Sequence, residues 1–94
     1  MATQLRRYTI AEDQMDRMVA WFPSIIPARE KYGFRIDFAY ADRENNQFVW
    51  AVSHDGDFDA ALAEYNDSPE RKAAFVDFES PVSDMTVGMV DQVV

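Results

Sequence analysis

The stretch that decides the fold is residues 34–54, FRIDFAYADRENNQFVWAVSH. Large apolar residues alternate with small or polar ones over Phe34–Ala41 and over Gln47–His54, and such alternation predicts two β-strands. The residues between these runs, 42–46, are polar and contain two asparagines, which is typical of a turn. Residues 34–54 are therefore predicted to form a β-hairpin.

The register of this hairpin decides which side chains share a face. If Asp42 pairs with Gln47, large apolar side chains lie on both faces, and an odd-length loop regroups them without removing either set. One face then carries Phe34, Ile36, Phe38 and Tyr40 with Val49, Ala51 and Ser53. The other face carries Arg35, Asp37, Ala39 and Ala41 with Phe48, Trp50, Val52 and His54.

The chain before the hairpin predicts one strand and an interrupted helix. Leu5–Ile10 alternates like a strand, and we expect Asp13 to cap the helix that follows, since its side chain can accept a hydrogen bond from the first turn. Pro23 and Pro27 lack the backbone N–H that a helix interior needs, so they predict a kink or restart, with helical structure resuming over Pro27–Tyr32. The apolar stripe of this helix consists of Met15, Met18, Val19, Phe22 and Ile26.

The chain after the hairpin predicts a second interrupted helix and a final strand. Residues 55–57 open a helix, and residues 68–70 (Ser-Pro-Glu) restart it with a capping serine and a proline in the first turn. Met85–Val94 is predicted to be the last strand. The order is β-α-β-β-α-β, an α+β class with a ferredoxin-like sandwich and a four-stranded antiparallel sheet in a single domain, residues 1–94.

Two helices can cover only one face of such a sheet. The hairpin pattern places large apolar side chains on both faces, and soluble monomers rarely expose apolar patches of that size. We therefore expect a second copy of the chain to cover the open face, as a homodimer through the sheet face.

The composition limits the partners and the chemistry. The 94 residues include 9 basic and 17 acidic ones, a net charge of −8, so we expect no nucleic acid and no membrane as partner, since both are bound through basic patches. The absence of cysteine excludes disulfides and thiol chemistry, and one histidine gives no basis for a metal site or a cofactor. No apolar run reaches the length of a membrane span and the N-terminus has no apolar signal core, so we expect a cytoplasmic protein.

Three segments resemble the NIPSNAP family: residues 5–10 (LRRYTI), 26–34 (IPAREKYGF) and 48–50 (FVW). The most specific part is Pro-x-Arg-Glu-x-x-Gly-Phe at residues 27–34, and the resemblance extends to about Phe78. It implies a dimeric α/β barrel, in which two ferredoxin-like protomers pair their sheets. The superfamily it implies includes monooxygenases, haem-degrading enzymes, isomerases and binding modules, so it does not select an activity.

Candidate site residues follow from a cleft expected between the first helix and the sheet. We expect the ligand-binding residues of this cleft to be Phe22, Trp50, Arg35, Asp37 and Tyr40. His54, the only histidine, lies opposite Arg35 in the Asp42–Gln47 register, so His54 and Tyr8 are the candidates for proton transfer. The alternatives are that His54 caps its strand end with a hydrogen bond to Asp55 or Asp57, and that the aromatic residues are simply core.

Arg6 and Arg7 stand out in so acidic a chain. They either bind an anionic or carbonyl-bearing ligand or form ion pairs with nearby carboxylates, and we favour the ion pairs, which contribute little when exposed. The leading hypothesis for the whole chain is binding of a small hydrophobic molecule. The alternatives are a cofactor-independent monooxygenase- or isomerase-like enzyme that uses His54, and a protein-interaction module without a ligand.

Overall fold

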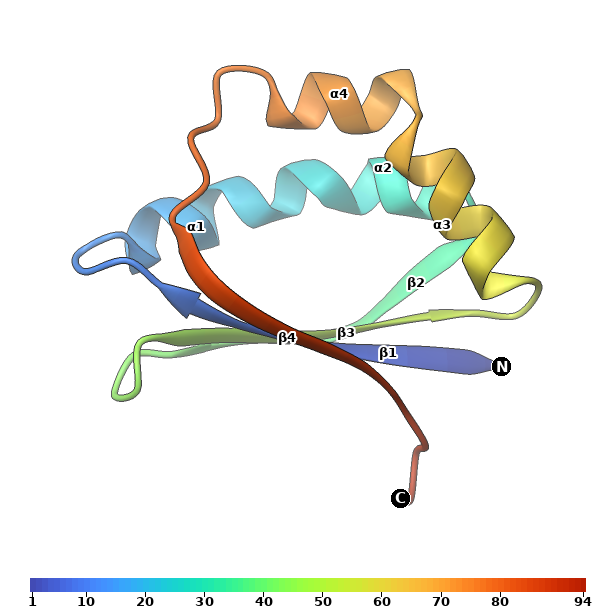
Figure 1. Cartoon of the computed structure of the whole chain (residues 1–94), viewed down its shortest axis with the longest axis horizontal. Coiled ribbons are helices and arrows are strands. Elements are labelled where there is room, and N and C mark those ends of the chain that lie inside the picture. The colour runs from blue at the N-terminus through green and yellow to red at the C-terminus, as the bar shows by residue number, and fades with distance from the viewer.

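The computed structural model describes all residues, 1–94, and its sheet has four antiparallel strands in the order β2-β3-β1-β4. Strand β1 (Ala2–Ile10) pairs with β3 (Gln47–His54) on one side and β4 (Val82–Val90) on the other, and β2 (Phe34–Asp42) forms the far edge. The predicted β-α-β-β-α-β order and the ferredoxin-like α+β class are confirmed. Figure 1 shows all the helices on one side of the sheet, so the other face is open.

The first crossover is helical but broken where the prolines were expected to break it. It consists of α1 (Met15–Trp21), the 3₁₀ helix η1 (Phe22–Ile25) and α2 (Ile26–Lys31). Pro23 and Pro27 each stand in the first turn of a new segment, where a missing N–H costs no hydrogen bond. Gly33, at φ +89°, ends the helical run in a backbone conformation that glycine adopts freely.

The predicted cap of the first helix is wrong. Gln14 occupies the N-cap position and makes no side-chain capping bond, while Asp13 lies one residue earlier in a turn at φ 62°. The second crossover behaves as predicted. Asp57 caps α3 (Phe58–Asn66) by accepting from the Ala60 N–H, and Ser68 caps α4 (Pro69–Phe75) by accepting from the Arg71 N–H.

A β-bulge in β2 changes the hairpin faces. Asp42 pairs with Gln47, which is the even-length register of the two that the sequence left open, but the register shifts between Ile36 and Phe38, so that Phe34 rather than Arg35 pairs with His54. A bulge inserts one residue into one strand, and side chains beyond it exchange faces. Phe34 therefore enters the core at 3% exposure, and Arg35 moves to the open face, opposite Ser53.

Strand β4 is shifted toward the N-terminus relative to the prediction. It begins at Val82, opposite Ile10, and ends at Val90, instead of spanning Met85–Val94. None of the helices is long and apolar enough to cross a membrane.

The core lies between the helices and the sheet, and its members come from every helix except α4 and from three strands. Trp50, Val52, Ile10 and Met18 are almost completely buried there. The open face also carries apolar side chains, among which Phe38 is 39% exposed and Tyr40 66% exposed. By register, their neighbours on that face are Leu5, Val49, Ala51 and Val90.

Candidate functional site: a cavity between helices and sheet

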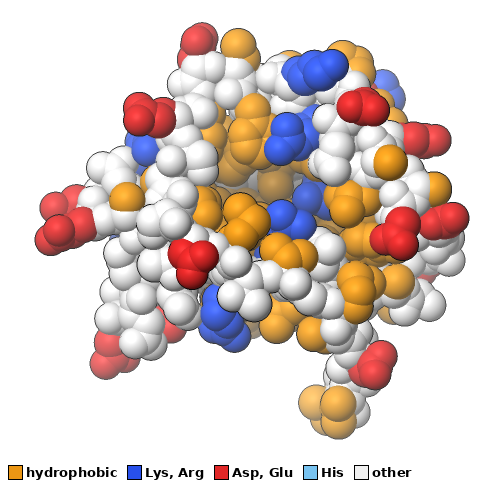
Figure 2. All heavy atoms as spheres, viewed as in Figure 1, with side chains coloured by type: hydrophobic (Ala, Val, Ile, Leu, Met, Phe, Trp, Pro, Cys, Tyr) orange, Lys and Arg blue, Asp and Glu red, His pale blue; other side chains and the backbone are white.

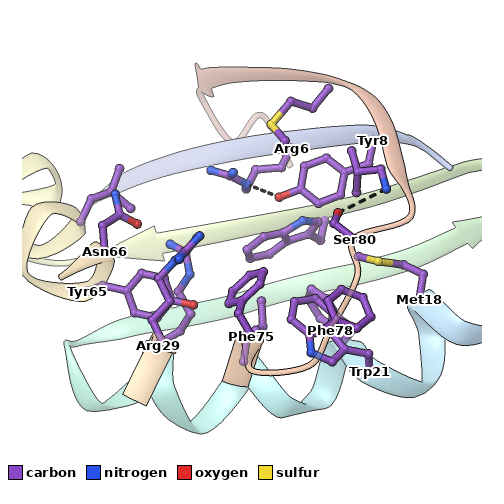
Figure 3. A pocket seen from close by; sticks show the side chains of 17 residues that line it. Arg6, Tyr8, Met18, Trp21, Arg29, Tyr65, Asn66, Phe75, Phe78 and Ser80 are labelled. Atoms are coloured by element: carbon purple, nitrogen blue, oxygen red, sulfur yellow. Dashed lines mark hydrogen bonds between the residues drawn. The ribbon is translucent and has the colours of Figure 1, made fainter. Parts of the chain in front are cut away.

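A cavity of about 350 Å³ lies between the helical layer and the sheet. Of the 17 residues that line it, 12 are hydrophobic. Figure 2 shows the hollow from outside, with hydrophobic and Lys or Arg side chains around it and carboxylates further out. Figure 3 shows its lining, including Arg6, Tyr8, Trp21, Arg29 and Phe78.

Each layer of the fold contributes one wall. The central strands supply Arg6, Tyr8 and Trp50, and the first crossover supplies Met18, Trp21, Phe22, Ile25 and Arg29. The second crossover, the segment after it and strand β4 complete the enclosure with Leu62, Tyr65, Asn66, Arg71, Phe75, Phe78, Ser80, Val82 and Met85.

Aromatic packing fixes the shape of these walls. The Phe22 ring meets the Trp50 indole edge-on at 5.1 Å between centroids, and Tyr8 meets the same indole at 6.3 Å. On the opposite side, Trp21 stacks flat on Phe78 at 4.0 Å, and its Nε1 donates a hydrogen bond to the Ala74 carbonyl at 2.8 Å. This stack joins the first crossover to the segment that leads into β4.

The charges that line the cavity are all positive. Arg6, Arg29 and Arg71 belong to the lining, and no aspartate or glutamate does. The chain as a whole has nearly twice as many acidic as basic residues, so the charge of the cavity lining is opposite in sign to the net charge of the chain.

Arg29 is the most unusual of the three because it is only 4% exposed. Its guanidinium carbon lies 4.3 Å from the centroid of the Tyr65 ring and 5.2 Å from those of Trp50 and Phe34. Its Nε and Nη1 have no hydrogen-bond partner, and neither has the Trp50 Nε1. Burial lowers the pKa of the Arg29 guanidinium, although an arginine remains protonated at neutral pH.

Arg6 is held by its neighbours on the same strand face. Its Nε donates to the Tyr8 hydroxyl and its Nη1 to the Gln4 side-chain carbonyl, both at 2.7 Å. The guanidinium also lies 5.4 Å from the centroid of the Trp50 ring. Arg6 thus forms hydrogen bonds to neutral groups and no ion pair, and it points to the cavity side of the sheet (Figure 3).

The structure separates the sequence-predicted site residues into two groups. Tyr8, Phe22 and Trp50 line the cavity together. Arg35, Asp37 and Tyr40 do not, because the β2 bulge and the strand alternation put them on the open face, where Arg35 pairs with Asp37 at 3.1 Å. Arg7 also lies away from the cavity, with its Nη1 donating to Gln47.

His54 does not line the cavity either. Its Nδ1 accepts the Gly56 N–H and its Nε2 lies 2.9 Å from the Tyr32 carbonyl, so both ring nitrogens have backbone partners. The Gly56 N–H requires a lone pair on Nδ1, and the proton therefore resides on Nε2 and is donated to Tyr32. The expected juxtaposition of His54 with Arg35 is wrong, because Phe34 pairs with His54. The partners expected for a capping role, Asp55 or Asp57, are also wrong, since His54 bonds to Tyr32 and Gly56 at its strand end.

Arg29, Tyr65 and Arg71 were missed by sequence reasoning. For Arg29 a signal exists, because Met18, Phe22, Ile25 and Arg29 follow one another at spacings of four, three and four, which places them on one helical face. An arginine among apolar residues on one helical face is expected to be buried, and this pattern could have identified Arg29.

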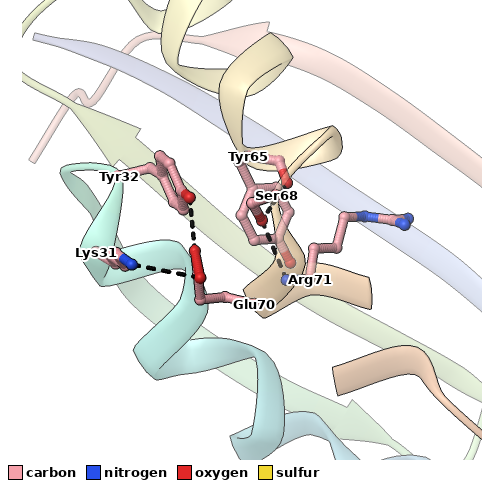
Figure 4. A network of polar contacts seen from close by, with 6 residues as sticks. All are labelled: Lys31, Tyr32, Tyr65, Ser68, Glu70 and Arg71. Atoms are coloured by element: carbon pink, nitrogen blue, oxygen red, sulfur yellow. Dashed lines mark hydrogen bonds and ion pairs between the residues drawn. The ribbon is translucent and has the colours of Figure 1, made fainter. Parts of the chain in front are cut away.

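A polar cluster fixes α2 against α4 beside the cavity (Figure 4). Glu70 accepts a hydrogen bond from the Tyr32 hydroxyl at 2.6 Å and pairs with Lys31 at 3.3 Å. The Tyr32 hydroxyl bond, together with Lys31, lowers the pKa of Glu70. The same hydrogen bond raises the pKa of Tyr32, because the carboxylate stabilises the protonated phenol.

Solved structures of other proteins share this architecture. An uncharacterized NIPSNAP domain protein from Burkholderia xenovorans superposes with a TM-score of 0.83 over 99% of this chain and 95% of its own, at 12% identity. A NIPSNAP family protein of unknown function from Agrobacterium tumefaciens gives 0.82 over 96% and 86%, at 9% identity. A putative antibiotic biosynthesis monooxygenase from Nitrosomonas europaea gives 0.73 over 98% and 89%, at 6% identity.

No protein-family model and no curated protein matches the sequence. At these low identities, the likeness to solved structures is a likeness of fold. This chain therefore has the ferredoxin-like fold of the NIPSNAP domain proteins, which it shares with a putative antibiotic biosynthesis monooxygenase.

Proposed function

We propose that this chain is a NIPSNAP-like protein that binds a small, mostly hydrophobic molecule in the cavity between its helices and its sheet. The observation that carries the proposal is the cavity itself, about 350 Å³ with 12 hydrophobic residues among 17. Protein cores normally contain few voids larger than a water molecule, and small-molecule sites have volumes of roughly 300–1,000 Å³ with mostly apolar walls. Aromatic side chains that surround such a space fit a binding site better than a closed core.

Calorimetric titration with 1-naphthylacetate, a bicyclic aromatic compound with one short arm, tests this proposal. Leu62 lines the cavity from α3, and Leu62→Trp adds bulk to the space. Ala63 is the next residue of the same helix and is exposed, so Ala63→Trp is the matched control. Saturable binding to the wild type and to Ala63→Trp, with loss in Leu62→Trp, supports the site; equal binding by all three, or none by the wild type, contradicts it.

The functional unit in this proposal is a homodimer that pairs the open faces of two sheets. Support comes from the apolar side chains of that face, with Phe38 and Tyr40 partly exposed among Leu5, Val49 and Val90. The helices cannot cover them, because all the helices lie on the other side of the sheet (Figure 1). Pairing the two sheets buries this apolar surface without altering the cavity side.

A further inference from the structure

The cavity is lined by positively charged side chains that no carboxylate neutralises. Its lining includes Arg6, Arg29 and Arg71 and no carboxylate. The three ion pairs of the structure join Lys31 to Glu70, Arg35 to Asp37 and Arg43 to Asp16, and none of them involves a cavity arginine. In a chain with 17 acidic residues, none lies where it would neutralise these three.

The buried side-chain nitrogen and oxygen atoms without hydrogen-bond partners all belong to residues of this site. They are Nε and Nη1 of Arg29 and Nε1 of Trp50, and both residues line the cavity. All three atoms are hydrogen-bond donors, and an arginine or an indole has no acceptor to offer. A ligand that complements them must therefore bring acceptor oxygens, and the guanidinium favours one with negative charge.

Aromatic rings surround Arg29 and stabilise its charge, but its Nε and Nη1 have no hydrogen-bond partner. Tyr65 provides the shortest of these contacts, at 4.3 Å from the guanidinium carbon to the ring centroid. Cation–π contacts leave the N–H groups in the guanidinium plane free, and buried polar groups in folded proteins are nearly always paired. Arg29 thus retains hydrogen-bonding capacity in a residue that lines a mostly apolar cavity.

We infer that the ligand of this cavity is a small hydrophobic carboxylic acid, whose carboxylate binds Arg29 and the Trp50 N–H while its apolar body contacts the aromatic walls. This inference rests on the proposed function and names its ligand class. The lining suits both parts of such a molecule. Its only charged residues are the arginines, which suit the carboxylate, and 12 of its 17 residues are hydrophobic, which suits the apolar body. Arg6, whose Nε and Nη1 already donate to Tyr8 and Gln4, adds positive potential.

The test compares two probes of equal size, 1-naphthylacetate and its neutral amide 1-naphthylacetamide, by calorimetry at neutral pH. The wild type is expected to prefer the carboxylate by roughly 10-fold to 100-fold, the range that charge-assisted hydrogen bonds provide. In Arg29→Met the preference for the acid disappears, since the charged donor that distinguishes a carboxylate from an amide has been removed. Arg43→Met removes an exposed arginine of the hairpin turn and should keep the full preference.

The outcomes separate the two claims. If the wild type binds acid and amide equally, or if Arg29→Met retains the preference, the carboxylate inference is wrong while the hydrophobic site stands. If the wild type binds neither probe, the proposed function fails and the inference fails with it. The wild-type ratio tests the ligand class without any variant, so that part of the test does not depend on how well Arg29→Met folds.

Discussion

The guanidinium carbon of Arg29 lies 4.3 Å from the centroid of the Tyr65 ring, so a helix from each crossover meets at a buried cation. Arg29 comes from α2 and Tyr65 from α3, and both side chains line the cavity (Figure 3). A cation in this place opposes folding unless something compensates for its lost hydration. The contact therefore links the stability of the helical layer to the function proposed for the cavity.

Replacing Arg29 by methionine should stabilise the empty protein. Desolvation of an unpaired buried charge costs several kcal/mol, whereas cation–π contacts return about 2 kcal/mol when desolvated, so the change should raise the free energy of unfolding by about 1–2 kcal/mol. Urea denaturation of the two proteins without ligand measures this. A loss of more than about 1 kcal/mol would show that Arg29 is a structural residue rather than a binding group.

Substitution of Tyr40 by glutamate should convert a dimer into a folded monomer. Tyr40 is 66% exposed on the open face, and a charge there cannot be buried against a second sheet without a large desolvation cost. Sedimentation velocity at micromolar concentration is expected to show a dimer for the wild type and a monomer for the variant. Val19→Glu, at an exposed position of α1, is the control that should stay dimeric; a wild-type monomer would contradict the sheet-to-sheet pairing.

The cluster around Glu70 predicts an acid-sensitive contribution to stability. Its pKa is lowered in the folded protein, so its contribution is complete above the ordinary glutamate pKa of about 4.3 and is lost as the pH falls through the lower folded value. Glu70→Gln should therefore reduce stability at pH 7 and flatten the pH dependence below about pH 4.3. Chemical denaturation from pH 7 to pH 3 measures both, and an unchanged slope in Glu70→Gln would refute the assignment.

Removal of the His54 imidazole should affect stability and not binding. Its ring accepts the Gly56 N–H and donates to the Tyr32 carbonyl, so His54→Ala should cost about 1–3 kcal/mol for two hydrogen bonds. Affinity for 1-naphthylacetate is expected to remain within about twofold. A His54→Ala variant with unchanged stability but no binding would show that His54 is a binding residue after all.

The sequence was sufficient for the element order because each element follows local rules. Alternation marks the strands, and Pro23, Pro27 and Ser68 mark helix boundaries through the donors they lack or the caps they supply. The Asp42–Gln47 pairing was not settled by these rules, since turns of even and odd length were both compatible with the sequence.

The faces on which the β2 side chains lie could not be assigned in the same way. The bulge between Ile36 and Phe38 depends on tertiary packing, because it brings Phe34 into the core opposite His54. A single inserted residue reverses the faces beyond it, which is why Arg35 and Asp37 were placed beside His54. Arg29 could not be assigned to the cavity for a different reason: its place on an apolar helical stripe indicates burial, but the cavity that it lines is formed by tertiary packing.

The measurement that tests the central claim most directly is a ¹H–¹⁵N spectrum recorded during titration with 1-naphthylacetate. The Trp50 Nε1–H and the Arg29 Nε–H both appear in such spectra, and neither has a partner in the chain. Binding in the cavity predicts that these two resonances shift together and saturate with the same affinity, while amides of the open face around Tyr40 stay in place. Shifts confined to the open face, or no saturable shift at Trp50 and Arg29, would contradict it.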